Sequence, residues 1–155
     1  MPMPIETIFI NQYARLAFQY DDGGRTKAGY GGDCVTRAVA IAAQMPYQEV
    51  FEAIHNLAQS TERITKRRKR KSNPAMSVRK ATSKRYIRSL GWKYTPTMGI
   101  GTGCRVHLRA HELPSGRLIV HVSKHLVAVI DGVIHDTYNP DREGTRCVYG
   151  YWSKE

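Results

Sequence analysis

Two residues carry the strongest chemical signal in this sequence, a cysteine at a predicted helix start and a histidine at a predicted strand start. Cys34 follows a glycine-rich stretch, residues 21–33, and opens the run CVTRAVAIAAQM. At the first turn of a helix, free backbone N–H groups and the helix dipole stabilise a thiolate and lower the pKa of the thiol. His125 opens the apolar run HLVAVI, where a fixed strand end suits a general base. The pattern predicts a nucleophile–base pair; the alternatives are a packing cysteine and a partly exposed edge histidine.

A third polar residue, Asp136, follows His125 across a predicted hairpin. The pair Asp131-Gly132 between two apolar runs is typical of a two-residue β-turn. Pairing residue 130 with 133 also pairs 127 with 136, which puts Asp136 within about two residue rises of His125. A carboxylate there would hold the imidazole in the tautomer that a base requires. Asn139 is the alternative orienting residue, because an amide oxygen can also accept the ring N–H.

The rest of the chain supplies the elements that must position these residues. Asp33 is predicted to cap a helix that begins at Cys34 and ends before Pro46. Apolar residues at helical spacing predict two more helices, at about 47–58 and 77–90, the second capped by Ser77 and ended by Gly91. Helices followed by a mostly antiparallel sheet indicate an α+β fold. The predicted strands are residues 8–10, 92–95, 105–108, 117–122, 126–130, 133–136 and 146–152.

The order of these elements resembles that of the papain-like cysteine peptidase superfamily. The matching stretches are GDCVTRAVAIA, KHLVAVIDG and VIHDTYNP. The closest similarity is to the compact bacterial and phage branch, which includes the peptidase domains of bacteriocin exporters. The resemblance implies a single papain-like domain over residues 1–155, with N-terminal helices packed on a C-terminal sheet. It implies a cysteine hydrolase of the peptidase or amidase type in which Cys34, His125 and Asp136 form a catalytic triad.

The chain departs from that family at the oxyanion donor. Papain-like enzymes place a glutamine about six residues before the cysteine, where this sequence has Ala28. Gln19 is the nearest upstream glutamine and is the candidate donor that the sequence offers. The departure also leaves open an inactive papain-like interaction module.

The positive charge of the chain is confined to one segment. The formal net charge is +11, yet residues 63–88 hold twelve Lys or Arg and no Asp or Glu, so the remainder is nearly neutral. A loop inserted at about residues 62–76 is predicted to be loosely ordered, because its consecutive cations repel one another. Such a loop favours contact with nucleic-acid phosphates or an acidic partner, and a nucleic-acid-binding protein built on residues 63–88 is the alternative function. The six consecutive cations are Lys66, Arg67, Arg68, Lys69, Arg70 and Lys71.

The remaining candidates favour neither a metal nor a cofactor. Cys104, His107 and His111 have the spacing C-x2-H-x3-H, which could supply three zinc ligands if His121, His135 or Cys147 completed the set. The two histidines share a face only in a helix, whereas the segment reads as strand, so we predict no metal site. The GIGTG stretch, residues 99–103, matches no dinucleotide or phosphate-binding fingerprint.

The cysteine count and the apolar runs bear on the compartment. Three cysteines without a CxxC pair argue against a disulfide framework, and Cys104 and Cys147 are predicted to be small core residues. A free Cys34 thiol fits a reducing environment. No apolar run is long enough to cross a bilayer, and the first residues do not resemble a signal peptide. We expect a cytoplasmic protein that acts on a peptide or amide substrate without a membrane.

Overall fold

A computed structural model of the chain describes residues 14–25 and 31–154. The predicted strand at residues 8–10 lies outside these residues. Within them, the helices are α2 (Cys34–Ala43), α3 (Tyr47–Thr61) and α4 (Lys80–Ser89). The strands are β1 (Ala17–Tyr20), β2 (Lys93–Pro96), β3 (Arg117–Val122), β4 (His125–Ile130), β5 (Val133–Asp136) and β6 (Val148–Ser153). The fold class is therefore α+β, as predicted.

The strands form one mixed sheet in the order β1-β5-β4-β3-β6-β2. Among the described strands, only β1 and β5 pair in parallel; the other neighbours are antiparallel. The β4–β5 hairpin has the predicted register, with Ile130 opposite Val133. Its turn residues Asp131 and Gly132 both have positive φ, 47° and 78°, which is the backbone that an Asp-Gly pair favours. This confirmed register is what places Asp136 beside the start of β4.

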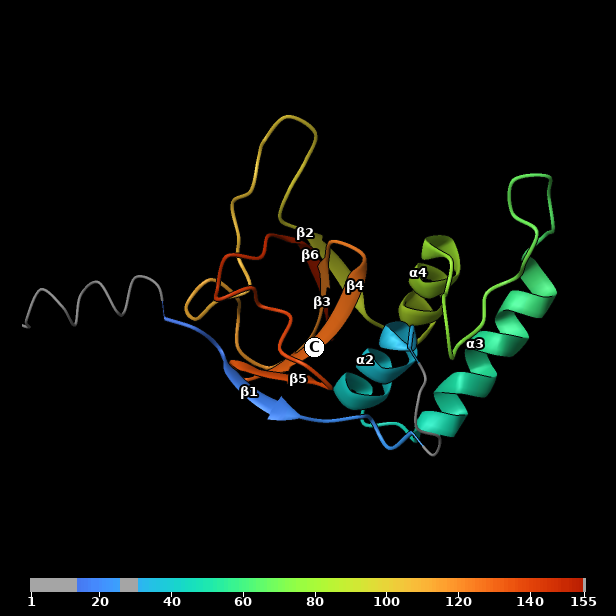
Figure 1. Cartoon of the computed structure of the whole chain (residues 1–155), viewed down its shortest axis with the longest axis horizontal. Helices are drawn as coiled ribbons and strands as arrows, with labels where there is room; N and C mark the ends of the chain where they lie inside the picture. Colours follow the sequence, from blue (N-terminus) through green and yellow to red (C-terminus); the bar gives the residue numbers. More distant parts are fainter. Residues whose placement is uncertain (1–13, 26–30, 155) are drawn as a thin grey trace, which may run out of the picture.

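The helices cover one face of the sheet, as Figure 1 shows, with α2 closest to β4. Strand alternation divides the core accordingly. On β4, Leu126 and Ala128 pack toward the helices, while Val127 and Val129 pack on the opposite face. The apolar side of α2 and the strand that begins with His125 are thereby fixed against each other by the core.

Two predicted helix caps are wrong. Asp33 makes no side-chain hydrogen bond to the start of α2, because its carboxylate is held by other side chains. Ser77 lies before α4, which begins at Lys80. The Ser77 N–H donates instead to the Asn73 carbonyl, in a turn of its own. Gly91 follows the end of α4 with φ 91°, as predicted for a residue that ends a helix.

The predicted strand at residues 105–108 is also wrong, because this stretch makes only an isolated bridge between His107 and Cys147. The His107 N–H donates to the Glu112 carboxylate, 3.1 Å away, rather than to a neighbouring strand. Buried Leu108 anchors the segment beneath the sheet. The loop thus covers the face opposite the helices.

The prediction about the cysteines fails at two positions. Cys104 and Cys147 are joined as a disulfide with their Cα atoms 5.8 Å apart. Cys104 is exposed and Cys147 half-buried, so neither is a core residue. Cys34 alone is a free thiol. Each helix among the described residues is too short or too polar to cross a membrane.

Candidate active site

Cys34 is the first residue of α2 and is partly exposed. The chain reaches it through Gly32, which packs so tightly that a Cβ there would lie 1.6 Å from the Met76 carbonyl oxygen. The segment that supplies Met76 is also held to the helix, because the Thr36 hydroxyl donates to the Pro74 carbonyl over 2.8 Å. These contacts fix the entry to α2 and hold the sulfur at the helix N-terminus, where the backbone N–H groups lack intrahelical acceptors.

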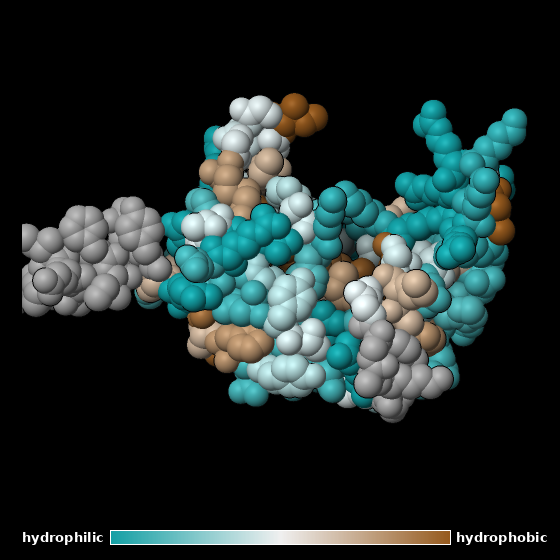
Figure 2. Space-filling model, in the orientation of Figure 1, coloured by the Kyte–Doolittle hydropathy of each residue, from teal (hydrophilic) through white to brown (hydrophobic). Residues whose placement is uncertain are grey.

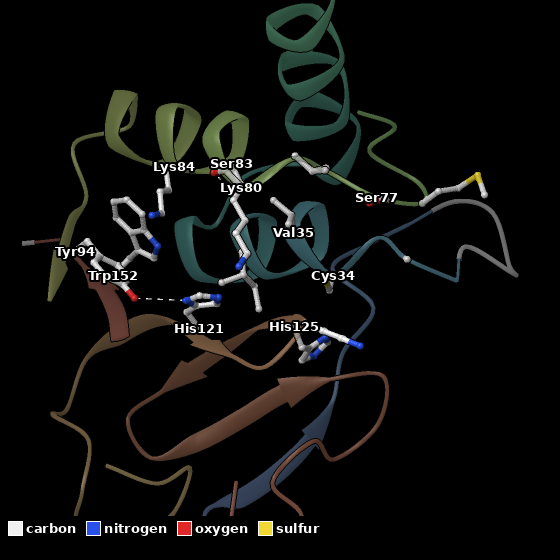
Figure 3. Close-up of a pocket in the computed structure, with 15 residues that line it drawn as sticks. Cys34, Val35, Ser77, Lys80, Ser83, Lys84, Tyr94, His121, His125 and Trp152 are labelled. Atoms are coloured by element: carbon white, nitrogen blue, oxygen red, sulfur yellow. Dashed lines mark hydrogen bonds between the residues drawn. The ribbon is translucent and has the colours of Figure 1, made fainter. Parts of the chain in front are cut away.

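His125 is the first residue of β4, and its imidazole meets the Asp136 carboxylate. The two side chains are buried, and His125 Nε2 lies 2.7 Å from Asp136 Oδ2. The antiparallel register makes the two residues diagonal neighbours on one face of the hairpin. With Nε2 engaged by the carboxylate, Nδ1 is the ring nitrogen left to face the Cys34 thiol, and both side chains line the same cavity. Figure 3 shows Cys34 and His125 next to each other.

A buried arginine, Arg37, holds the Asp136 carboxylate in place. Arg37 Nη2 donates to Asp136 Oδ1 over 2.8 Å, and the Thr137 N–H donates to the same oxygen over 2.7 Å. The other arm of Arg37 forms a buried ion pair with Asp33, whose second oxygen accepts from the Tyr47 hydroxyl over 2.8 Å. Both oxygens of Asp136 are therefore occupied, and its orientation toward His125 is fixed.

The electrostatics of the group favour a charged sulfur. Burial raises the pKa of the Cys34 thiol, but the hydrogen bond with His125 and the charge of its imidazolium outweigh burial. The Leu126 N–H and the charge of Arg37 act in the same direction, so the pKa of Cys34 lies below its ordinary value. A thiolate is thereby favoured at this position.

The imidazole shifts in the opposite direction. Burial lowers the pKa of His125, while the hydrogen bonds with Asp136 and Cys34 raise it above its ordinary value overall. Burial raises the pKa of Asp136, but its contacts with His125 and Arg37 hold it below its usual range. The pKa shifts of Cys34 and His125 both act in the direction that favours a thiolate–imidazolium pair over the neutral pair.

The pair opens into a cavity of about 320 Å³. The cavity lies between the start of α4, the first turn of α2 and the ends of β3 and β6, as Figure 3 shows. Cys34 and His125 are both among its lining residues. The sulfur is thus within reach of a ligand in the cavity.

Two candidates from the sequence are placed elsewhere. Gln19 is exposed on β1, its amide donates to the Tyr20 carbonyl over 3.1 Å, and it does not line the cavity. Asn139 does not orient the imidazole, because its amide oxygen accepts the Asp141 N–H over 3.1 Å in a local turn. Ala28 lies outside the described residues. Asp136 alone of the two predicted orienting residues contacts His125.

Hydrogen bonds and an ion pair hold the two ends of the predicted basic loop in place. The Glu62 carboxylate accepts hydrogen bonds from the Ser72 and Thr82 hydroxyls, both 2.5 Å long, and forms an ion pair with Arg79. Arg79 also donates to the carbonyls of Arg63 and Arg70. The loose order predicted for this loop therefore does not extend to its ends. Figure 2 shows hydrophilic side chains over α3 and the α3–α4 connection; the side chains of residues 66–70 are exposed, and that of residue 71 is half-buried.

The zinc-like spacing does not produce a metal cluster. Cys104 is consumed by the disulfide, and His107 Nδ1 faces the Glu112 carboxylate at 3.2 Å. His111 has a left-handed backbone, with φ 69°, so the segment that holds the two histidines is not helical. Across residues 14–25 and 31–154, no three His, Cys, Asp or Glu side chains gather in a way that could hold a metal ion.

Sequence reasoning missed several residues that surround the candidate site. Arg37 is the main omission. It lies in an otherwise apolar helix, four residues after Asp33, and this spacing is a signal of a buried ion pair. Tyr138, whose ring centre lies 5.4 Å from that of His125, follows Asp136 closely in the chain. Lys80 and Lys84 line the cavity, and their helical spacing alone gives no indication of that role.

Comparison with known proteins adds no relative. No family model matches the chain, and neither a curated protein nor a solved structure matches it. Inference of function therefore depends on the geometry of Cys34, His125 and Asp136.

Proposed function

We propose that this protein is a papain-like cysteine hydrolase of the peptidase or amidase type. The observation that carries the proposal is the position of the His125 imidazole, which contacts a carboxylate through Nε2 and lies beside the Cys34 thiol at a helix N-terminus. A thiol held by a histidine that is in turn held by a carboxylate is the arrangement of an activated nucleophile. The cavity beside the sulfur gives a substrate access to it.

The order of the elements supports the papain-like part of the proposal. The cysteine lies at the start of α2, the histidine at the start of β4 and the carboxylate at the end of β5. The helices precede most of the sheet in the chain and cover one of its faces. This is the arrangement that the resemblance of the sequence implies.

The proposed reaction begins with transfer of the Cys34 thiol proton to Nδ1 of His125. The sulfur then donates an electron pair to the substrate carbonyl carbon, and the carbonyl π electrons move to its oxygen. The Cys34 N–H, at the helix N-terminus, stabilises that oxyanion. When the tetrahedral intermediate collapses, the C–N bond breaks and the amine leaves with the proton from Nδ1.

Deacylation repeats these steps with water. His125 takes a proton from water, the oxygen attacks the thioester carbon, and the C–S bond breaks to release a carboxylic acid and restore Cys34. Asp136 stays ionised throughout and stabilises the imidazolium. If another amine replaces water, the same acyl-enzyme gives acyl transfer.

A cytoplasmic location belongs to the same proposal, because a nucleophilic thiol is kept reduced there. The disulfide between Cys104 and Cys147 is the feature that tests this location. Trapping thiols in intact cells with an alkylating reagent, followed by mass spectrometry, measures the state of the pair. A largely reduced pair agrees with the cytoplasm, whereas a fully oxidised pair contradicts it.

The activity itself is tested with an activated ester. Incubation with p-nitrophenyl acetate should release p-nitrophenol and add one acetyl group to Cys34, detected by peptide mass spectrometry. Cys34→Ala should abolish acetylation at that site, and His125→Ala should slow both acylation and deacylation. Absence of a Cys34 acyl adduct, with release no faster than for the Cys34→Ala variant, would favour an inactive interaction module.

One observation favours a second function, binding of nucleic acid. Five consecutive cations, residues 66–70, are exposed on the α3–α4 loop. Phosphate contacts by such residues give binding that weakens steeply with salt. Fluorescence anisotropy with labelled DNA and RNA should then show affinity that falls with added salt and disappears when residues 66–71 are neutralised. Binding unaffected by that neutralisation contradicts this second function.

A further inference from the structure

The charged side chains that line the cavity beside Cys34 are positive. Three lysines line it, Lys80 and Lys84 from α4 and Lys124 from the turn between β3 and β4. Among the residues that the structure describes, fifteen line the cavity and none of these is Asp or Glu. Lysine ammonium groups around a partly enclosed space create a positive potential that raises the local concentration of anions.

The cations are spread along the cavity. In Figure 3, Lys80 lies between Trp152, on the left, and the pair Cys34 and His125, further to the right. Lys124 directly precedes His125 in the chain. An extended ligand that reaches the sulfur therefore passes more than one ammonium group.

A neutral histidine inside the cavity is consistent with this field. Burial lowers the pKa of His121, and the charges of Lys80 and Lys84 lower it further. His121 therefore leaves the positive charge to the lysines at neutral pH. Its Nδ1 lies 3.4 Å from the Tyr94 hydroxyl, and both groups offer hydrogen bonds in the cavity wall.

We propose that the cavity binds an acidic peptide segment, with Asp or Glu carboxylates next to Lys80, Lys84 and Lys124 and an adjoining acyl group at Cys34. This inference rests on the proposed hydrolase activity and names its substrate class. The volume of about 320 Å³ suits a short extended segment rather than a folded surface. The ammonium groups that line the cavity favour an acidic segment over a neutral one, because they can form ion pairs with its carboxylates.

The aromatic residues of the cavity favour a peptide over a single-stranded nucleic acid. Base binding needs a free aromatic face for stacking. Trp152 is only 2% exposed. Its ring contacts Tyr94 at 5.0 Å between centres and lies beneath the Arg88 guanidinium at 5.6 Å. In addition, a cysteine–histidine pair attacks acyl carbon, which nucleic acids do not present.

Protection of Cys34 from alkylation tests the proposal. The rate of Cys34 modification by iodoacetamide is measured at low salt with increasing amounts of the capped peptide Ac-Glu-Glu-Glu-Glu-NH2, its Gln counterpart or an eight-residue oligothymidylate. The acidic peptide should protect at an about tenfold lower concentration than the Gln peptide, since each of two or three partly screened ion pairs contributes a few-fold. Added salt should reduce that difference.

Matched variants assign the effect to the cavity. In a Lys80→Gln, Lys84→Gln double variant, the two peptides should protect at nearly equal concentrations. Arg85→Gln, on an exposed residue of the same helix that does not line the cavity, should leave the preference unchanged. The alkylation rate without peptide checks that Cys34 is still reactive in each variant.

The possible results separate this inference from the proposed function. Alkylation of Cys34 without any peptide at the rate of an ordinary thiol would overturn the hydrolase itself. Fast alkylation with equal protection by both peptides, or with none, would overturn the acidic substrate and leave the hydrolase intact. Protection by the oligothymidylate but not by the acidic peptide would overturn the acidic peptide as the ligand and favour nucleic acid.

Discussion

Replacement of Asp136 by Asn should disable the nucleophile while changing almost no volume. Asp136 Oδ1 accepts from Arg37 and from the Thr137 N–H, so an amide at this position must keep its oxygen there. The amide NH2 then faces Nε2 of His125 and donates to it. The ring proton moves to Nδ1, the nitrogen that must accept the thiol proton from Cys34.

The size of the effect follows from the bond that is lost. The buried hydrogen bond between His125 and Asp136 is 2.7 Å long, and a charge-assisted bond contributes about 1.5–3 kcal/mol. Losing it lowers the pKa of His125, because the imidazolium loses the carboxylate that stabilises it. Because the imidazolium holds down the pKa of Cys34, the thiolate population near neutral pH should fall about 10–100-fold.

The assay is the rate of Cys34 alkylation by iodoacetamide as a function of pH, read by peptide mass spectrometry. The wild-type rate should rise with pH through a midpoint below that of an ordinary thiol, and the midpoint in Asp136→Asn should move upward. Asn139→Ala is the matched control, since Asn139 contacts the Asp141 N–H rather than the imidazole. Near-UV circular dichroism checks that each variant keeps its packing.

The reasoning is refuted if a folded Asp136→Asn variant reacts at the wild-type rate and midpoint. It is also refuted if Asn139→Ala has the larger effect, because the amide would then be the orienting group.

Three further predictions concern parts of the fold around the site. Gly32→Ala should slow thiol alkylation and lower the melting temperature, because a Cβ would lie 1.6 Å from the Met76 carbonyl oxygen; a wild-type rate and melting curve would contradict this. Glu62→Gln should cost about 1–3 kcal/mol of unfolding free energy at neutral pH by urea denaturation, since buried donors lose a charged acceptor. Contacts with hydroxyl and N–H donors hold the pKa of Glu62 below its usual value despite burial. The stabilisation by Glu62 is therefore present above its unfolded-state pKa and should fade as the pH drops through its folded-state pKa. A pH-independent difference between wild type and Glu62→Gln would contradict this prediction. Reduction of the Cys104–Cys147 disulfide should lower stability by about 2–4 kcal/mol but preserve ester hydrolysis, because neither cysteine lines the cavity; loss of activity in a still-folded reduced protein would contradict it.

Local patterns in the sequence were sufficient where backbone geometry decides the outcome. The Asp131-Gly132 turn fixes the hairpin register, and the register fixes where Asp136 lies relative to His125. The start of α2 at Cys34 follows from the glycine-rich stretch before it and the apolar periodicity after it. These features depend on neighbours in the chain, which a single sequence displays.

Features that depend on distant contacts were not predictable. Asp33 looks like a helix cap, but its carboxylate is recruited by Arg37 and the Tyr47 hydroxyl, which the fold brings to it. Cys104 and Cys147 are 43 residues apart in sequence, and nothing in their surroundings indicates that two loops meet there. The position of Lys80 and Lys84 at the cavity was also not predictable, because it depends on the strands that the fold places opposite α4.

The most direct test of the central claim is the dependence of Cys34 alkylation on His125. At mildly acidic pH, wild-type Cys34 should react with iodoacetamide much faster than an unperturbed thiol, and His125→Ala should remove that advantage and shift the midpoint toward that of a free cysteine. If wild-type Cys34 instead reacts slowly, with an ordinary midpoint that His125→Ala leaves unchanged, the sulfur and the imidazole do not act as a pair.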